Sequence, residues 1–95
     1  MTTTRRETAL AHVAKELEWI DRNVGRYPVS GHEALGVLLE EVDEFKQSVY
    51  QDAPSYSEAI QVAAVAVRIL EWIQSEPDRW PSTEVAHMVH RWKTS

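Results

Sequence analysis

Residues 57–74 form the stretch that most limits what this chain can fold into, because alanine, valine and isoleucine occupy most sides of a helix there. The stretch is long and lacks the period-two alternation of a strand, so we expect the most buried helix of the fold. Its polar residues Glu58, Gln61 and Arg68 follow one another at steps of three and seven and therefore share one stripe. Buried polar groups need partners, so a neighbouring polar helix face is predicted.

Another helix is expected at the start of the chain. Thr4 and Glu7 have the spacing of a capping box, which satisfies backbone donors at a helix start. Gly25 and then Pro28 end the helix that follows. Its apolar stripe, with residues three and four apart, consists of Leu10, Val13, Ala14, Leu17, Ile20 and Val24.

A further helix is expected between these two, opening at Ser30 with the capping spacing to Glu33 and ending before a turn at 52–55. Its apolar stripe consists of Ala34, Leu35, Leu38, Leu39, Val42, Phe45 and Val49. Beyond a proline-containing break, a short last helix is expected over about residues 82–92. Four helices with short connections predict an all-α four-helix bundle.

Length and charge narrow the class of protein. A chain of 95 residues is a single domain, 1–95, that buries roughly 60–65% of its unfolded surface, so its core is marginal. With 43% hydrophobic residues, the chain is expected to complete its fold as a homodimer or homotetramer. A net charge of −5 argues against nucleic-acid binding, which needs a basic surface, and allows a phosphorylated ligand if metal ions mediate.

The sequence also bears on the compartment. It contains no cysteine, which fits a reducing environment. No apolar segment of signal-peptide type follows the N-terminus, so no signal peptide is expected. The apolar run at 59–73 is too short and, with Gln61, Arg68 and Glu71, too polar for a membrane span. We therefore expect a soluble, cytoplasmic protein that does not bind membranes.

Four acids crowd the middle of the second expected helix, namely Glu40, Glu41, Asp43 and Glu44. Glu41 and Glu44 are neighbours on one face, and Glu41 borders the apolar stripe. Like charges at this spacing destabilise a helix by about 0.2–0.5 kcal/mol. A divalent cation bound between them would make the interaction favourable. Magnesium prefers such oxygen ligands. The alternative is a solvated acidic face, with Arg68 forming a structural ion pair with one of these acids.

At these positions the chain resembles a known family. Glu41-x-x-Glu44 followed by Glu58-x-x-Gln61 is similar to the paired acidic motif of the MazG-like, all-α nucleoside triphosphate pyrophosphohydrolases. The amino-acid sequence of residues 32–45 and 58–68 also resembles that of small members of the superfamily, and the resemblance covers about residues 30–75. It implies a MazG-type fold that hydrolyses a nucleoside or deoxynucleoside triphosphate to monophosphate and pyrophosphate with Mg²⁺, or alternatively Mn²⁺.

The resemblance also implies roles for single residues. The implied metal ligands are Glu41, Glu44, Glu58 and Gln61. Glu40 is implied as a base for the attacking water or a ligand to a second metal, so that the candidate catalytic residues are Glu40, Glu41 and Glu44. The candidate residues for binding the negatively charged phosphates of the substrate are Lys46 and Arg68. Arg68 has a further possible role in holding a carboxylate in place.

Gln61 departs from the family pattern, which has aspartate there. A neutral ligand weakens metal binding, so the second hypothesis is a catalytically inactive MazG-like helical protein with a binding or regulatory role. A third is a di-iron oxidase, because Glu84-x-x-His87 has the spacing of di-iron bundles, although only one such pair occurs. Base stacking and core packing both remain open for the tryptophans, which are Trp19, Trp72, Trp80 and Trp92.

Overall fold

The computed structural model describes residues 3–75, and over this range the chain is helical with no strand. The helices are α1 (Arg5–Asn23), α2 (Gly31–Tyr50) and α3 (Tyr56–Gln74). None of the three has both the length and the apolar character needed to cross a membrane. The all-α prediction and the first three expected helices are confirmed for this range. Outside the described residues lie the helix expected over 82–92, the Glu84-x-x-His87 pair, Trp80 and Trp92.

Each helix begins at a side-chain cap. The Thr4 hydroxyl accepts from the Glu7 N–H at 3.1 Å, and the Glu7 carboxylate accepts from the Thr4 N–H at 3.4 Å, so the predicted capping box is confirmed. The hydroxyls of Ser30 and Ser55 accept from the N–H three residues onward at 3.1 and 3.2 Å. Because Ser55 is the cap, α3 starts at Tyr56, one residue earlier than expected.

The end of α1 follows from a glycine. Gly25 has a φ of +78°, a conformation that residues with a Cβ rarely adopt, and the chain leaves the helix there. The backbone N–H groups of Val24 and Gly25 both donate to the Ile20 carbonyl, at 2.8 and 3.1 Å. The predicted stop of the first helix is therefore confirmed.

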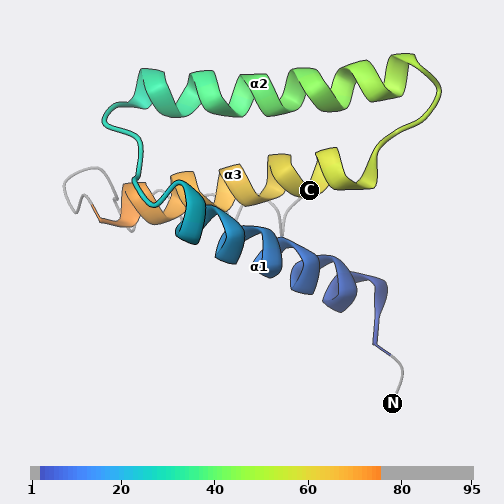
Figure 1. Ribbon diagram of the computed structural model, residues 1–95, viewed down its shortest axis with the longest axis horizontal. Helices are drawn as coiled ribbons and strands as arrows, with labels where there is room; N and C mark the ends of the chain where they lie inside the picture. Colours follow the sequence, from blue (N-terminus) through green and yellow to red (C-terminus); the bar gives the residue numbers. More distant parts are fainter. Residues whose placement is uncertain (1–2, 76–95) are drawn as a thin grey trace, which may run out of the picture.

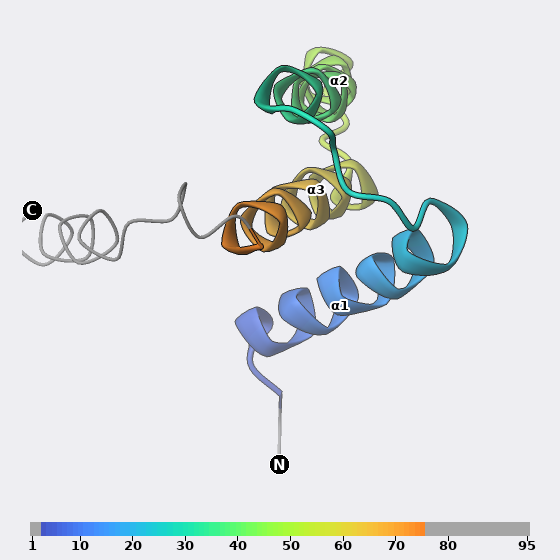
Figure 2. The ribbon, with the colours of Figure 1, turned by 90° about the vertical axis from the view of Figure 1, so that its left-hand side faces the viewer.

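α3 is the central element of the described fold. It lies between α2 on one side and α1 on the other, antiparallel to α2 and crossed obliquely by α1 (Figures 1 and 2). Three of the four buried residues of the described range belong to it: Ala64, with no exposed surface, Arg68 and Trp72. The expectation that this helix is the most buried one is confirmed.

Arg68 fastens α1 and the connection after it onto α3. Its guanidinium donates to Asp21 Oδ1 at 2.9 Å and to the Arg26 carbonyl, and its Cζ lies 4.8 Å from the centroid of the Tyr27 ring. The Tyr27 hydroxyl in turn donates to Glu71 Oε1 at 3.3 Å. The interpretation that pairs Arg68 with an acid of α2 is therefore wrong, because its carboxylate partner is on α1. A buried guanidinium with these partners holds the layers in register.

The described core is thin, and much apolar surface remains outside it. Among the described residues, each of the three helices has large apolar side chains that are at least 40% exposed, such as Leu10 on α1, Leu39 on α2 and Leu70 on α3. The predicted stripe of α2 divides in two: Ala34, Leu38 and Phe45 are buried or half-buried, whereas Leu35 and Leu39 are more than half exposed. α3 therefore covers only one side of the apolar surface that α2 presents.

Candidate metal centre

Three carboxylates meet where α2 packs on α3. Glu41 and Glu44 come from consecutive turns of α2, and Glu58 comes from the first turn of α3. One carboxylate oxygen from each lies within 4.8 Å of the others. Glu41 and Glu58 are half-buried, and Glu44 is exposed. The arrangement joins residues 17 positions apart in the sequence, which helix spacing alone does not do.

The connection between α2 and α3 places Glu58 at this point. The Ser48 hydroxyl near the end of α2 accepts from the Ser55 N–H at 3.1 Å, and the Ser48 carbonyl accepts from the Ala53 N–H at 3.1 Å. Ser55 then caps α3 by accepting from the Glu58 N–H. Ser48 therefore closes the connection between α2 and α3, and Ser55 fixes the first turn of α3, which carries the Glu58 carboxylate.

The cluster concentrates negative charge, and the pKa values respond. Partial burial raises the pKa of Glu41 above its ordinary value, and the charges of Glu44 and Glu58, a hydrogen bond with Glu44 and the charge of Glu40 raise it further. Desolvation also raises the pKa of Glu58, together with a hydrogen bond to Glu44 and its charge. Either a shared proton or a bound cation relieves this repulsion.

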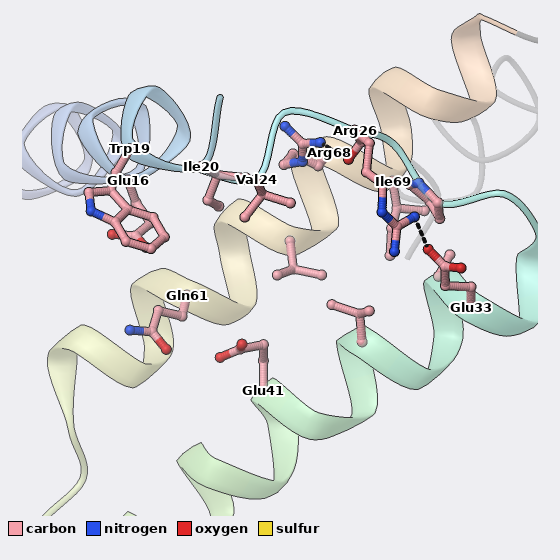
Figure 3. Close-up of a pocket in the computed structure, with 14 residues that line it drawn as sticks. Glu16, Trp19, Ile20, Val24, Arg26, Glu33, Glu41, Gln61, Arg68 and Ile69 are labelled. Carbon is pink, nitrogen blue, oxygen red and sulfur yellow. Dashed lines mark hydrogen bonds and ion pairs between the residues drawn. The ribbon is translucent and has the colours of Figure 1, made fainter. Parts of the chain in front are cut away.

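Gln61 completes the group from the next turn of α3. Figure 3 draws its amide oxygen toward Glu41. With the amide oxygen and nitrogen exchanged, the NH₂ group donates to Glu41 Oε2 at 2.9 Å and to Glu58 Oε2 at 3.3 Å. The exchanged orientation suits the cluster without an ion, because the amide NH₂ group then donates to both carboxylates. The unexchanged orientation, with the amide oxygen facing Glu41 and Glu58, suits a cation bound between the three side chains.

The donor set fits magnesium. Three carboxylate oxygens, with the amide oxygen of Gln61 in the unexchanged orientation, would supply four of the six oxygen ligands that Mg²⁺ takes and would leave two positions for water or phosphate. Opposite ligands of one Mg²⁺ lie about 4.2 Å apart, given metal–oxygen distances of about 2.1 Å. Carboxylate oxygens within 4.8 Å of one another therefore reach such an ion by small side-chain rotations.

The other predicted site residues lie outside this group. Glu40 is exposed and acts on Glu41 through its charge. Lys46 is also exposed, and its Nζ lies 5.7 Å from the centroid of the Tyr50 ring on the next turn of α2. Arg68 contacts α1 and the following connection, as described above. The structure thus groups four of the predicted residues and leaves Glu40, Lys46 and Arg68 around them.

A cavity of about 570 Å³ lies beside the cluster, between α1 and α2 and over α3 (Figure 3). Glu41 and Gln61 stand at one end of it, and Trp19, about half exposed, lies on the α1 side. The apolar part of the wall comprises Ile20, Val24, Pro28, Ala34, Val37, Val65 and Ile69, and charged residues complete it, namely Glu16, Arg26, Glu33 and Arg68. The cavity therefore joins the acidic cluster to a mainly apolar and aromatic surface that also carries charges of both signs.

Sequence reasoning missed three charged residues of this cavity, namely Glu16, Arg26 and Glu33. Arg26 Nη1 lies 2.6 Å from Glu33 Oε1, and this ion pair spans the α1–α2 connection at the cavity wall. Both residues flank a break between helices, where periodicity carries no information about contacts. Only the seven-residue separation of opposite charges around a short connection could have suggested the pair.

Comparison of the chain with models of protein families, with curated proteins and with solved structures finds no match.

Proposed function

We propose that the chain is a magnesium-dependent nucleoside triphosphate pyrophosphohydrolase, which converts a nucleoside or deoxynucleoside triphosphate to the monophosphate and pyrophosphate. The observation that carries the proposal is the convergence of Glu41, Glu44 and Glu58 from two helices at the end of a cavity. Carboxylates gathered in this way suit a reaction in which polyphosphate charge must be neutralised. The resemblance of the acidic motif supports the same reaction.

On this proposal Glu41, Glu44, Glu58 and Gln61 hold Mg²⁺, with Mn²⁺ as an alternative. The ion supplies neutralisation of the triphosphate charge and a lowered pKa of a bound water. Glu40, which is exposed on the same helix and outside the ligand set, would accept the proton of the attacking water and pass it to solvent, while Glu41 stays a ligand. The water attacks the α-phosphorus, the bond to the bridging oxygen breaks, and pyrophosphate leaves.

The cavity would hold the nucleoside. Its apolar wall excludes water from one side of the ligand, and the half-exposed Trp19 offers a ring for stacking. Lys46 is exposed on α2 and can reach the phosphates only by leaving the ring of Tyr50. Arg68 acts on this reading mainly by holding α1, and with it Trp19, beside α3. We also propose that the enzyme works as a cytoplasmic homo-oligomer.

A pyrophosphate-release screen tests the activity. The purified chain is incubated with common and damaged nucleoside triphosphates, with Mg²⁺ or Mn²⁺, and released pyrophosphate is measured. Glu41→Gln and Glu44→Gln should abolish release while helical circular dichroism is kept. Asp43→Asn is the matched control, because Asp43 lies on the same helix and its carboxylate accepts from Gln47 Nε2 at 2.8 Å, outside the three-carboxylate group. Equal loss in the control, or no release with any nucleotide, would refute the proposal.

The second candidate is a catalytically silent helical protein that binds or regulates a partner. Gln61 favours it, since its amide can donate to Glu41 and Glu58 and so stabilise the cluster with no ion bound. Calorimetry distinguishes the two candidates: the enzyme should bind Mg²⁺ at millimolar or lower concentration, with or without a non-hydrolysable nucleotide. A silent protein shows no heat beyond dilution and no gain of activity in Gln61→Asp.

A further inference from the structure

Glu16 is a half-buried carboxylate on the cavity wall, and its side chain has no partner among residues 3–75. The other charged residues of the wall are already bound: Arg26 pairs with Glu33, and Arg68 binds α1. Glu41 belongs to the acidic cluster, whereas Glu16 lies outside that group. An ionised carboxylate accepts hydrogen bonds on both oxygens and donates none. Glu16 therefore offers two free acceptor oxygens to a molecule bound in the cavity.

The carboxylate lies beside the aromatic ring that would hold the base. Glu16 and Trp19 are three residues apart on α1, so their side chains leave the same face of the helix. Figure 3 draws both on the α1 side of the cavity, across from Gln61 and Glu41. A base stacked on the face of the indole would therefore turn part of its edge toward Glu16.

Space for that edge continues past Glu16. A second hollow, also of about 570 Å³, borders Glu16, Trp19 and Gln61 as well, and extends between α1 and the start of α3. These three residues therefore stand where the two hollows meet. A base that reaches Glu16 from the cavity has open space beside the carboxylate.

The chemistry of a carboxylate narrows which base fits. It repels phosphate oxygens, and its favourable partners are N–H and O–H groups. Uracil and thymine place one N–H between two carbonyl oxygens, and adenine and cytosine place an amino group beside an unprotonated ring nitrogen. Among the common bases, guanine presents two adjacent donors, N1–H and the 2-amino group. These two donors match the two oxygens of one carboxylate.

We propose that Glu16 makes the cavity selective for guanine nucleotides, by accepting hydrogen bonds from N1–H and the 2-amino group while Trp19 stacks on the base. The inference rests on the proposed function, which puts the triphosphate at the acidic cluster and the nucleoside in the cavity. Hydrogen bonds to a charged acceptor are about twice as strong as neutral ones, and two parallel bonds add geometric specificity. A matched bidentate pair of this kind discriminates against a wrong base by roughly 5- to 150-fold.

Calorimetry with non-hydrolysable triphosphate analogues and Mg²⁺ tests the selection without turnover. The unmodified chain should bind the guanine analogue roughly fivefold or more tightly than the hypoxanthine analogue, which lacks only the 2-amino group. The adenine and uracil analogues should bind no better than hypoxanthine. Equal affinity for guanine and hypoxanthine, or no binding of the guanine analogue, would overturn the inference. A chain that prefers guanine but releases no pyrophosphate would refute the reaction alone, and an active chain without the preference would refute the base selection alone.

Variants of α1 assign the preference to one side chain. Glu16→Gln puts an NH₂ group where guanine also donates, so the preference for guanine over hypoxanthine should disappear. Glu18→Gln is the matched control and should keep the preference, because Glu18 is exposed on the same helix and borders the second hollow and not the cavity. Trp19→Leu should weaken all the analogues by a similar factor, since stacking serves every base. Circular dichroism checks that the variants stay helical. A Glu16→Gln chain that still prefers guanine would overturn the inference.

Discussion

Replacing Glu44 by glutamine should stabilise the metal-free protein. The substitution keeps the shape of the side chain and removes one of three charges whose oxygens lie within 4.8 Å of one another. At that separation, Glu41 and Glu44 repel by about 0.9 kcal/mol in water and by about 3.5 kcal/mol at an effective dielectric constant of 20. Because Glu44 is exposed and Glu41 only half-buried, solvent screening favours the lower end, about 1 kcal/mol.

This free energy is large enough to measure as a shift of Tm. For a domain of 60–100 residues, about 1 kcal/mol corresponds to about 4–8 °C. In low salt at pH 7, with a chelator present, Glu44→Gln should therefore melt about 4–8 °C above the unmodified chain when followed by circular dichroism. Mg²⁺ should reduce or reverse that order, because an ion at tenfold its Kd stabilises the unmodified chain by about 1.4 kcal/mol.

The pH dependence gives an independent check of the same repulsion. Because the pKa of Glu41 is raised in the folded state, the folded chain binds protons more tightly than the unfolded one. The stability of the metal-free protein should therefore fall as pH rises from about the ordinary value of 4.5 through the raised value. Glu44→Gln, which removes a main cause of the shift, should flatten this fall.

Two results would refute the reasoning. One is a lower Tm for Glu44→Gln without metal at pH 7, which would mean that Glu44 stabilises the fold. The other is an equal Mg²⁺ response in both chains, which would exclude Glu44 as a ligand. Asp43→Asn is the control: it removes a charge from the same turn outside the three-carboxylate group, and its amide oxygen can still accept from Gln47 Nε2, so its Tm should not rise as much.

Other substitutions test the packing around the cluster. Arg68→Met should lower the free energy of unfolding by about 2–4 kcal/mol in urea denaturation, because Asp21 and the Arg26 carbonyl lose a buried donor. Arg68→Lys should recover only part of it, since one ammonium cannot reproduce both contacts. Gln61→Glu should lower Tm in chelator and tighten Mg²⁺ binding in calorimetry, because it adds a fourth negative ligand. Ala64→Leu should cost about 1–3 kcal/mol by the urea assay, since Ala64 has no exposed surface.

The described helices could be predicted because the signals that define them are local. The caps at Thr4 and Ser30 and the stop at Gly25 each act within a few residues, and the structure places the helix ends there. The start of α3 was expected one residue late, because Ser55 was assigned to the turn and not to the cap. The burial of α3 follows from its composition for the same reason. Local hydrogen bonding and steric preference leave few alternatives at these positions.

The sequence predicted those contacts of the candidate site that follow from helical spacing, but not those that depend on how the helices cross. Spacing placed Glu41 beside Glu44, and the polar stripe of α3 placed Gln61 toward α2, where its amide meets Glu41. Spacing could not choose the partner of Arg68, because the crossing of α1 over α3 depends on packing between segments far apart in the sequence. Asp21 is 47 residues away from Arg68. The cavity beside the cluster arises from the same crossing and was not predictable either.

The amide of Gln61 connects the two candidate functions. An aspartate there would add a fourth charge to a cluster whose carboxyl pKa values are already raised, so that the metal-free fold would be less stable. Glutamine can instead donate hydrogen bonds to Glu41 and Glu58, and under the proposed function it would turn its amide to present an oxygen to a bound ion. The residue would then lower both the intrinsic affinity for the ion and the free-energy cost of the ion-free state. Under the proposed function, the chain should bind magnesium reversibly, and most tightly when a polyphosphate supplies the missing negative ligands. A nucleotide analogue should therefore increase the magnesium affinity of this chain more than it increases the magnesium affinity of Gln61→Asp.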